Sequence, residues 1–267
     1  MNLVEFLQEL SIKGWQIWSE GSQLRYDAPK EESTTSVLAL LKQHKGEILQ
    51  LLHDNPDILN VYPLSYGQQA MWFLWKLAPG SCVYNVSVPV RICSQVDVTA
   101  WKQAFQAICQ RHLILSSTFP KLGQVPIQQV DRHQEVDFLQ VDASTWSKEE
   151  LNQRVIEAHK HPFNLEKESG MRVRWFVRSF QEHILLLTIH HIACDGWSID
   201  IIFQELAKLY QAQQTNVPAS LPPLNYSYQD YVRAQRKILD SPRGEILWQY
   251  WKQKLAGELP SLNLPTD

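Results

Sequence analysis

Residues 186–198 contain a group of side chains suited to acid–base chemistry. An apolar run ends in His190 and His191, and Asp195 and Gly196 follow within five residues of the second histidine. An imidazole with an unperturbed pKa of about 6.5 both accepts and donates a proton near neutral pH. A positioned general base of this kind typically accelerates a reaction by about 10² to 10⁴. The segment therefore predicts a site of proton transfer.

The two adjacent histidines are not expected to bind one ligand together. Successive side chains on a strand point to opposite faces, so a metal held by both His190 and His191 is disfavoured. We expect one imidazole to enter a cavity and the other to be held in the structure. A single histidine on an apolar strand is more often a buried structural residue. Two histidines, Asp195 and Gly196 within seven residues nevertheless favour a functional site.

Other residues of the segment bear on the type of reaction. Asp195 is suited to orienting a neighbouring group through a charged hydrogen bond, and Gly196 lets a reacting carbonyl approach the backbone closely. Ser198 is the expected N-cap of a following helix. The sequence has no GxSxG nucleophile motif, and Cys194 has no clear activating partner. Direct attack between two bound substrates therefore fits better than a covalent enzyme intermediate.

Strands and helices must alternate around this segment to position it. Apolar extended runs are predicted at 84–92, 126–130, 172–179 and 183–190, and helical patterns at 98–112, 147–159 and about 198–213. This alternation indicates an α/β or α+β fold with a layered sheet.

Composition excludes several classes of protein. The 267 residues are 44% hydrophobic and 20% charged, which suits a soluble globular protein with at least one full core. The net charge of −3 gives no electrostatic footprint for nucleic acid or an anionic membrane. The sequence offers no signal peptide and no apolar run long enough to span a bilayer. Four widely spaced cysteines fit a reducing cytosol, so we expect a cytoplasmic protein.

The first 57 residues differ in charge from the rest of the chain. They carry five basic and nine acidic residues, net −4, whereas residues 58–267 carry twenty and nineteen, net +1. A polar stretch containing Pro56 suits a linker, so we place a boundary near residue 57. In this N-terminal module (residues 1–57), the pattern predicts a helix ending at Gly14, a β-hairpin around Gly21, and one or two closing helices.

The predicted hairpin has open edges, and open strand edges are suited to capturing an extended peptide. Arg25 on the second strand, with Lys13 and Lys30 flanking it, offers positive charge to an acidic peptide. Leu24 and Tyr26 on the same strand are candidates for setting selectivity. Each charge taken singly is more often just a solvated surface group, and that alternative stays open.

Residues 190–196 resemble the HHxxxDG motif of condensation domains of nonribosomal peptide synthetases. Three further segments are similar to motifs of this family, in the family's order. Residues 64–74 resemble its opening motif, residues 111–119 its RHxxLRTxF motif and residues 226–231 its YxDYA-type segment. The N-terminal module, especially Gly21–Pro29, is similar to tubulysin-type N-terminal docking domains.

The resemblance implies a fold and an activity. Residues 1–57 form a small helix–hairpin–helix docking domain, and residues 58–267 form the N-terminal lobe of a condensation domain, a chloramphenicol-acetyltransferase-like α/β sandwich. The second lobe is missing, so the chain resembles a fragment of a longer synthetase that is inactive by itself. The complete domain forms an amide bond between carrier-bound thioesters. Residues 65–68 and 72–74, with Tyr84 and Asn85, also resemble condensation domains fed by polyketide modules.

Roles for individual residues follow from the resemblance. His191 acts on the acceptor amine as a base or by positioning it. His190 belongs to the same catalytic motif, with a structural role as the main expectation and contact with the substrate as the alternative. Asp195 pairs with an arginine, for which Arg111 is the candidate, and Gly196 offers its backbone to the reacting site. Ser116 replaces the second arginine of the RHxxLRTxF motif, so any ionic role of that position is absent or supplied elsewhere. No metal site is implied.

Cofactor and partners also follow from the resemblance. Phosphopantetheine is supplied by donor and acceptor carrier proteins and is not bound as a cofactor of this chain. The N-terminal module receives the C-terminal peptide of an upstream synthetase subunit and also admits a homodimer, and the missing lobe is a further partner. Two alternatives remain: a non-catalytic docking fragment, and another acyltransferase of the same superfold that uses free coenzyme A.

Overall fold

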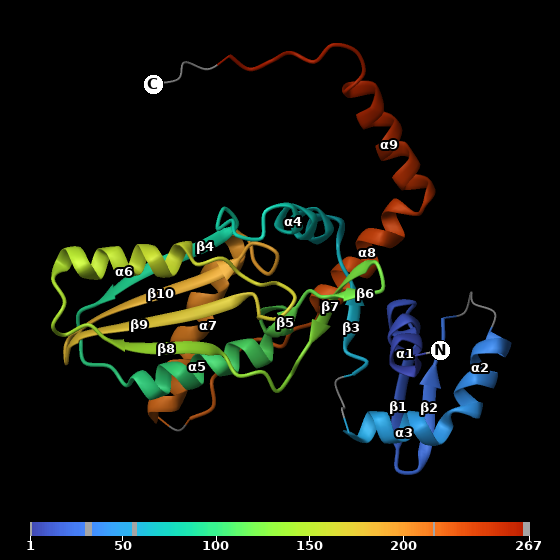
Figure 1. Cartoon of the computed structure of the whole chain (residues 1–267), viewed down its shortest axis with the longest axis horizontal. Coiled ribbons are helices and arrows are strands. Elements are labelled where there is room, and N and C mark those ends of the chain that lie inside the picture. Colours follow the sequence, from blue (N-terminus) through green and yellow to red (C-terminus); the bar gives the residue numbers. More distant parts are fainter. Residues whose placement is uncertain (1, 30–33, 55–57, 216, 264–267) are drawn as a thin grey trace. The chain divides into compact units, whose positions relative to one another are not determined.

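The computed structural model describes residues 2–29, 34–54, 58–215 and 217–263. It contains two compact units, Met1–Pro223 and Leu224–Asp267 (Figure 1). The first unit includes the N-terminal module and the layered sheet that carries the histidines.

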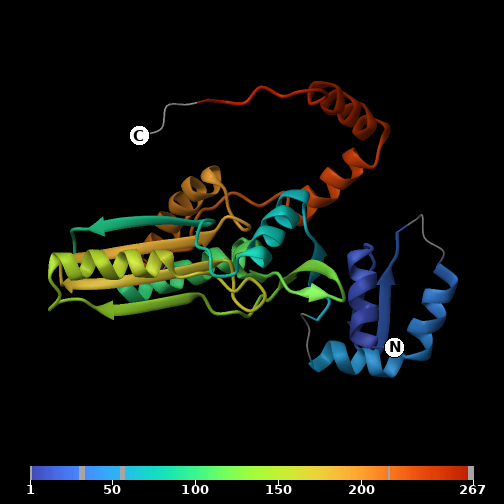
Figure 2. The same ribbon diagram turned by 45° about the horizontal axis from the view of Figure 1, so that its top comes forward.

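In the N-terminal module a β-hairpin follows one helix and precedes two others (Figures 1 and 2). Its elements are α1 (Leu3–Ile12), β1 (Gln16–Glu20), β2 (Gln23–Asp27), α2 (Thr34–Gln43) and α3 (Lys45–Asp54). The hairpin turn contains Gly21 with φ 57°, in the left-handed region that favours glycine. The predicted order of helix, hairpin and helices is confirmed.

The core of this module draws on its helices, its hairpin and the chain just after it. The buried members are Leu7, Leu10, Trp15, Ile17, Leu41, Ile48, Leu52 and Ile58. The Ser11 hydroxyl donates to the Leu59 carbonyl at 2.9 Å. Packing therefore extends through Ile58 and Leu59. The boundary near residue 57 stays a prediction, and residues 55–57 lie outside the described part of the chain.

The larger sheet of the first unit has the strand order β4-β10-β9-β8. The strands are β4 (Asn85–Ile92), β10 (Glu182–His190), β9 (Met171–Ser179) and β8 (Asp137–Asp142). Only the β8–β9 pair is parallel. A smaller sheet joins β3 (Val61–Pro63), β7 (Val125–Val130) and β5 (Ser117–Thr118), and β6 (Lys121–Leu122) pairs with β7.

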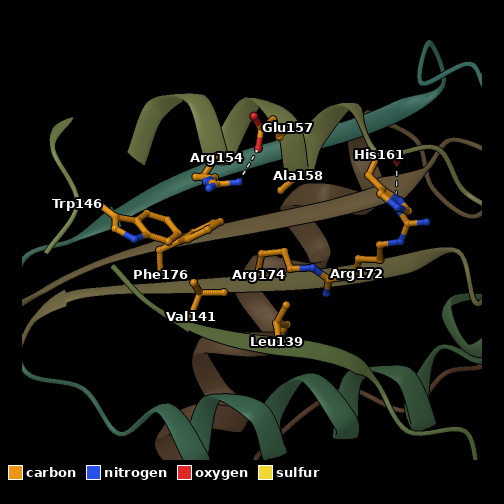
Figure 3. Close-up of a pocket in the computed structure, with 10 residues that line it drawn as sticks. All are labelled: Leu139, Val141, Trp146, Arg154, Glu157, Ala158, His161, Arg172, Arg174 and Phe176. Carbon is orange, nitrogen blue, oxygen red and sulfur yellow. Dashed lines mark hydrogen bonds and ion pairs between the residues drawn. The ribbon is translucent and has the colours of Figure 1, made fainter. Parts of the chain in front are cut away.

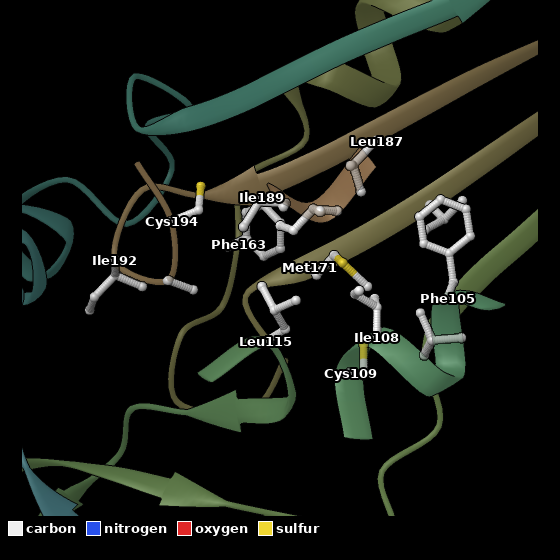
Figure 4. Packing of buried hydrophobic residues seen from close by; sticks show 14 of the residues in the cluster. Phe105, Ile108, Cys109, Leu115, Phe163, Met171, Leu187, Ile189, Ile192 and Cys194 are labelled. Atoms are coloured by element: carbon white, nitrogen blue, oxygen red, sulfur yellow. The ribbon is translucent and has the colours of Figure 1, made fainter. Parts of the chain in front are cut away.

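Helices cover both faces of the larger sheet (Figures 1 and 2). One layer contains α5 (Val98–Arg111) and α7 (Gly196–Thr215), which pack on strand residues Val173, Trp175, Leu185, Leu187 and Ile189. The other contains α6 (Lys148–Lys160), whose Leu151 packs with Phe176 and Leu186. Figure 4 shows how the main core continues to Ile192 and Cys194, just beyond the end of β10. The core thus reaches directly to the histidine segment, and the predicted α/β lobe is confirmed.

Two more elements complete the first unit. Helix α4 (Tyr66–Leu77) begins at an N-cap formed by Ser65, and a 3₁₀ helix spans Leu113–Ser116. Both lie close to the main core, because Trp72 and Trp75 of α4 and Leu115 of the 3₁₀ helix are among its buried members.

The C-terminal unit (Leu224–Asp267) contains two helices, α8 (Tyr228–Leu239) and α9 (Pro242–Lys254). A Cβ atom on Gly244 would lie 2.0 Å from the Leu239 carbonyl oxygen, so only glycine permits this close turn between the helices. Several large apolar side chains of α9 are exposed: Ile246, Leu247, Trp248, Tyr250 and Trp251.

Candidate active site

His190 is the last residue of β10, and its side chain is almost completely buried, with 3% exposed. Its ring packs against Tyr84 and edge-on to Phe163, with centroid distances of 6.1 and 5.9 Å. Its Nδ1 accepts a hydrogen bond from the Ile192 amide at 3.1 Å. Burial, and secondarily the nearby His191 and Arg172, lower the pKa of His190 to about 4. His190 is therefore a neutral imidazole that holds the following turn.

His191 is the first residue beyond the strand, and its surroundings differ. Its amide donates to the Tyr84 carbonyl at 2.8 Å, and the residue is half-buried. The Nδ1 atom is buried, yet it has no hydrogen-bond partner within the described part of the chain. Buried polar atoms without partners are uncommon in folded proteins. Of the two adjacent imidazoles, His191 is thus the one with unused hydrogen-bonding capacity.

Asp195 ends the turn and directly precedes α7. Its Oδ1 accepts hydrogen bonds from the Ser198 amide at 2.9 Å and from the Ser198 hydroxyl at 2.7 Å, and Ser198 Oγ accepts from the Asp195 amide at 3.2 Å. The bonds from Ser198 lower the pKa of Asp195. The prediction that Ser198 is the N-cap is therefore wrong, because Asp195 caps a helix that begins two residues earlier, at Gly196.

The predicted pairing of Asp195 with Arg111 is also wrong. Arg111 Nε donates to Glu205 Oε2 at 3.0 Å, and a second guanidinium nitrogen donates to the Pro222 carbonyl. His112 Nε2 lies 2.6 Å from the same Glu205 oxygen. Burial opposes ionisation of Glu205, but the hydrogen bonds from His112 and Arg111 outweigh it and lower the pKa of this carboxyl. Arg111 thus joins α5 to α7 and does not contact Asp195. The Asp195 carboxylate is instead bonded to Ser198, as the N-cap of α7.

Gly196 is exposed at the start of α7. A Cβ atom built on it would meet nothing within 4 Å. The space around this position would therefore admit a side chain, so packing does not account for the presence of glycine at position 196. Its predicted role, to offer backbone to a reacting group, stays a prediction.

A sizeable pocket lies away from the histidines, between α6 and strands β8 and β9 (Figure 3). It is a groove of about 420 Å³ lined by Leu139, Val141, Trp146, Arg154, Glu157, Ala158, His161, Arg172, Arg174 and Phe176. Its arginines have partners: Arg174 pairs with Asp137 at 2.7 Å and Arg172 with Glu168 at 2.6 Å. The pocket contains neither His190 nor His191.

The described residues offer neither a metal site nor a membrane-spanning helix. Within residues 2–29, 34–54, 58–215 and 217–263, no three His, Cys, Asp or Glu side chains are grouped so that they could hold a metal ion. Over the same residues, no helix combines the length and apolar character needed to cross a membrane.

Residues 58–267 match the family model of the condensation domain. The chain belongs to the condensation-domain family. Residues 3–54 match a second family model, the TubC N-terminal docking domain. The condensation-domain match includes both histidines.

Individual proteins similar to this chain include a peptide synthetase and solved domains of the same fold. The phosphinothricin tripeptide synthetase PhsC of Streptomyces viridochromogenes is 35% identical over 218 residues, which are 79% of this chain and 20% of that protein. The X-domain in a complex with OxyB from teicoplanin biosynthesis has a TM-score of 0.69 and 29% identity, over 76% of this chain and 45% of that one. The first condensation domain of the calcium-dependent antibiotic synthetase has a TM-score of 0.63 at 18% identity. The match covers 73% of this chain and 47% of that one. The chain thus spans a small part of this synthetase and about half of a solved condensation domain.

Within this condensation domain, sequence reasoning missed one residue that contacts the histidine turn. The buried Gln68 side chain donates to the Ile192 carbonyl at 3.2 Å, from a position 124 residues earlier. Gln68 lies in the segment that resembles the family's opening motif, and its spacing of three residues from Ser65 is typical of a capping box. That spacing predicts a helix start, but not a contact with a distant turn.

The predicted docking residues are divided between two faces of the hairpin. Arg25 is opposite Trp18 in the strand register, whereas Leu24 and Tyr26 alternate to the other face. Arg25 is exposed and pairs with Glu20 at 2.6 Å. Leu24 packs on the module's core and Tyr26 lies against Trp15. Lys13 is exposed, and Lys30 lies outside the described residues.

Proposed function

We propose that this chain contributes the histidine half of an amide-forming site in a nonribosomal peptide synthetase. The observation that carries the proposal is the contrast between the two imidazoles. His190 is neutral and holds the turn, whereas the buried Nδ1 of His191 has no partner among the described residues. The condensation-domain family supports the type of reaction. The substrates are a donor thioester and an acceptor aminoacyl thioester, each on the phosphopantetheine arm of a carrier protein.

The proposed step is direct aminolysis of the donor. The acceptor amine attacks the thioester carbonyl carbon, a C–N bond forms, the C–S bond breaks, and the donor carrier leaves as a thiol. The amine loses one proton in this exchange, and the departing sulfur gains one. His191 either transfers this proton as a base or orients the amine through a hydrogen bond.

The thiol of Cys194, three residues after His191, is a poor nucleophile, which supports direct attack. Cys194 is buried, and burial together with the charge of Asp195 raises its pKa to about 12. A thiol in this state is almost entirely protonated at neutral pH. A covalent acyl-cysteine intermediate is therefore disfavoured.

The exposed apolar side chains of α9 support a second half of the site outside this chain. Trp248 and Trp251 are 60% and 56% exposed, and Ile246 and Tyr250 are exposed as well. Contiguous exposed aromatic side chains of this kind mark an interaction surface. The chain covers 47% of a solved condensation domain. We assign the second lobe of such a domain as the partner that covers α9, so the chain by itself is expected to be inactive.

The N-terminal module is assigned to capture of an upstream subunit. Its hairpin has two strands, and in the proposal an acidic C-terminal peptide adds to β2. Because Arg25 is already paired with Glu20, an acidic residue of the peptide must replace Glu20 to reach the guanidinium. The match to the TubC docking domain supports this role.

The reaction itself is tested with the complete two-lobed domain and two loaded carrier proteins. Mass spectrometry of the intact proteins should show the acyl group transferred to the acceptor carrier as an amide, a free thiol on the donor carrier, and no added mass on the condensation domain. An acylated domain, or transfer to a soluble alcohol from free coenzyme A, would contradict the proposal.

The same experiment distinguishes a domain that catalyses amide formation from one that only binds its partners. The X-domain structure shows a 29% identical chain of this fold in a complex with OxyB, which keeps a purely binding role as the second candidate. If the complete domain binds both carriers but forms no amide, the binding role is favoured.

A further inference from the structure

Gln68 connects the start of α4 to the turn that carries His191. It is the third residue of α4 and is 3% exposed. Its side-chain Oε1 accepts a hydrogen bond from the main-chain amide of Ser65 at 3.1 Å. The main-chain amide of Gln68 donates to Ser65 Oγ at 3.1 Å. Its Nε2 then donates to the Ile192 carbonyl at 3.2 Å. Both ends of the carboxamide are therefore engaged.

The turn is fixed on each side of His191. The His191 amide is held by the Tyr84 carbonyl, and the Ile192 amide is held by His190 Nδ1. Gln68 holds the remaining polar group of Ile192, its carbonyl. The peptide units around His191 thus have partners on a neighbouring strand end, in the turn itself and on α4.

The two hydrogen bonds of the Gln68 side chain need both a donor and an acceptor. The side chain must accept from the Ser65 amide and donate to the Ile192 carbonyl, and the carboxamide of glutamine does both from two separate atoms. A carboxylate of the same length keeps the first bond and loses the second. A methionine of similar size loses both and leaves two buried main-chain groups without these partners.

We propose that Gln68 is a positioning residue that fixes the orientation of the His191 imidazole through the backbone of Ile192. Its effect on catalysis rests on the function proposed for His191. Its effect on the geometry of the turn does not. Small misplacements of a catalytic group lower the rate strongly, by up to about 10²-fold for a shift of about 1 Å. The helix cap and the histidine turn therefore act as one unit.

Two substitutions separate the contact with the turn from the helix cap. Gln68→Glu retains an acceptor for the Ser65 amide and removes the donor to Ile192. Gln68→Met removes both without adding charge. The matched control is Gln106, which bridges two main-chain groups far from the histidines in the sequence: its Nε2 donates to the Gln134 carbonyl at 3.1 Å and its Oε1 accepts from the Val136 amide at 2.8 Å. Gln106→Glu and Gln106→Met remove the equivalent side-chain hydrogen bonds at this control position.

The first readout is the NMR signal of the His191 ring in the full 267-residue chain, assigned with a His191→Asn variant. Both Gln68 variants should shift the ring resonances, and both Gln106 variants should leave them unchanged. A carboxylate charge can itself shift the resonances of a nearby imidazole. The neutral Gln68→Met variant is therefore the one that tests whether loss of the hydrogen bonds moves the His191 ring. Unchanged His191 resonances in a folded Gln68→Met chain would overturn the proposal.

A measurement on the unaltered chain guards against variants that fail to fold. The side-chain amide protons of Gln68 should exchange with solvent far more slowly than those of Gln50, which is exposed and donates to the Asp54 carboxylate. Equal exchange rates would show that the contact with Ile192 is not maintained, and would also overturn the proposal.

The catalytic consequence is measured in the complete two-lobed domain. Gln68→Glu should lower kcat by at least about tenfold with little change in KM, whereas Gln106→Glu should alter neither beyond its effect on stability. If His191→Ala keeps full activity, the function proposed for His191 fails, while the NMR result for Gln68 still stands or falls separately. A shifted His191 signal with unchanged kcat would limit Gln68 to a structural role.

Discussion

His190 and His191 are adjacent in the sequence but differ in burial and in hydrogen bonding. The side chain of His190 is buried and its Nδ1 accepts from Ile192, and burial lowers its pKa to about 4. His191 is half-buried, and its Nδ1 has no partner among the described residues. At the scale of single residues, the division of roles between the two imidazoles thus follows from where β10 ends.

The low pKa of His190 predicts a loss of stability in mild acid. In the unfolded chain the imidazole binds a proton below about pH 6.5, whereas the folded protein keeps it neutral until about pH 4. The unfolded state therefore gains protons first, and the free energy of unfolding falls as the pH is lowered through this window. Between pH 7 and pH 5 we expect a loss of about 2 kcal/mol from this residue.

The measurement is urea unfolding of the unaltered chain and of His190→Asn at both pH values. Asparagine does not titrate and retains an oxygen acceptor for the Ile192 amide. The variant should lose less stability than the unaltered chain between pH 7 and pH 5. Equal losses would show that His190 is not protonated on unfolding in this range.

At the scale of elements, α5 and α7 are joined by a partly buried hydrogen-bonded cluster. Glu205 of α7 accepts from Arg111 of α5, and His112, just after α5, contacts the same oxygen. Because Arg111 also donates to the Pro222 carbonyl, the cluster fixes the chain near the end of the first unit. Asp195, in contrast, is exposed and bonded to Ser198.

A double-mutant cycle checks this assignment of partners. Arg111→Met and Glu205→Gln should be coupled by about 1–3 kcal/mol, because they remove the two sides of one buried interaction. Arg111→Met and Asp195→Asn share no hydrogen-bond partner and should add within about 0.5 kcal/mol. Thermal or urea unfolding of the single and double variants gives both values. Strong coupling of Arg111 to Asp195 would restore the pairing expected from the sequence.

The sequence predicted the apolar strands of the larger sheet better than its polar edge strand β8 and the helix cap. Apolar runs at 84–92, 172–179 and 183–190 match β4, β9 and β10 within one residue at each end. Strand β8 was missed because its residues are exposed or half-buried and its pairing with β9 is distant in the sequence. The cap at Asp195 and the partner of Arg111 depend on tertiary contacts, which no local pattern contains.

At the scale of the whole chain, the N-terminal module and the condensation domain are assigned separate tasks. The module has its own core, and Ile58 and Leu59 after it pack on that core. The condensation domain has a different core, built on both sides of its larger sheet. Removal of residues 1–57 should therefore abolish capture of the upstream peptide. It uncovers Ile58 and Leu59, but should leave the core of the condensation domain intact.

Calorimetric titration with the C-terminal peptide of the upstream subunit measures this capture. Arg25→Glu should weaken binding, and Glu20→Gln should strengthen it, because Glu20 competes for the same guanidinium. Both effects should diminish with salt, since exposed charges are screened over about 8 Å at physiological ionic strength. Equal affinity for the chain that lacks residues 1–57 would show that the N-terminal module is not the docking site.

The rate of amide formation by the complete two-lobed domain with His191→Ala tests the central proposal most directly. The variant should fold normally and form the amide at least about tenfold more slowly, because the imidazole that acts on the amine is gone. Cys194→Ala is the control and should retain the rate, since the proposal gives its buried thiol, whose pKa is raised to about 12, no part in the reaction. A His191→Ala domain that forms the amide at the unaltered rate would remove His191 from the mechanism.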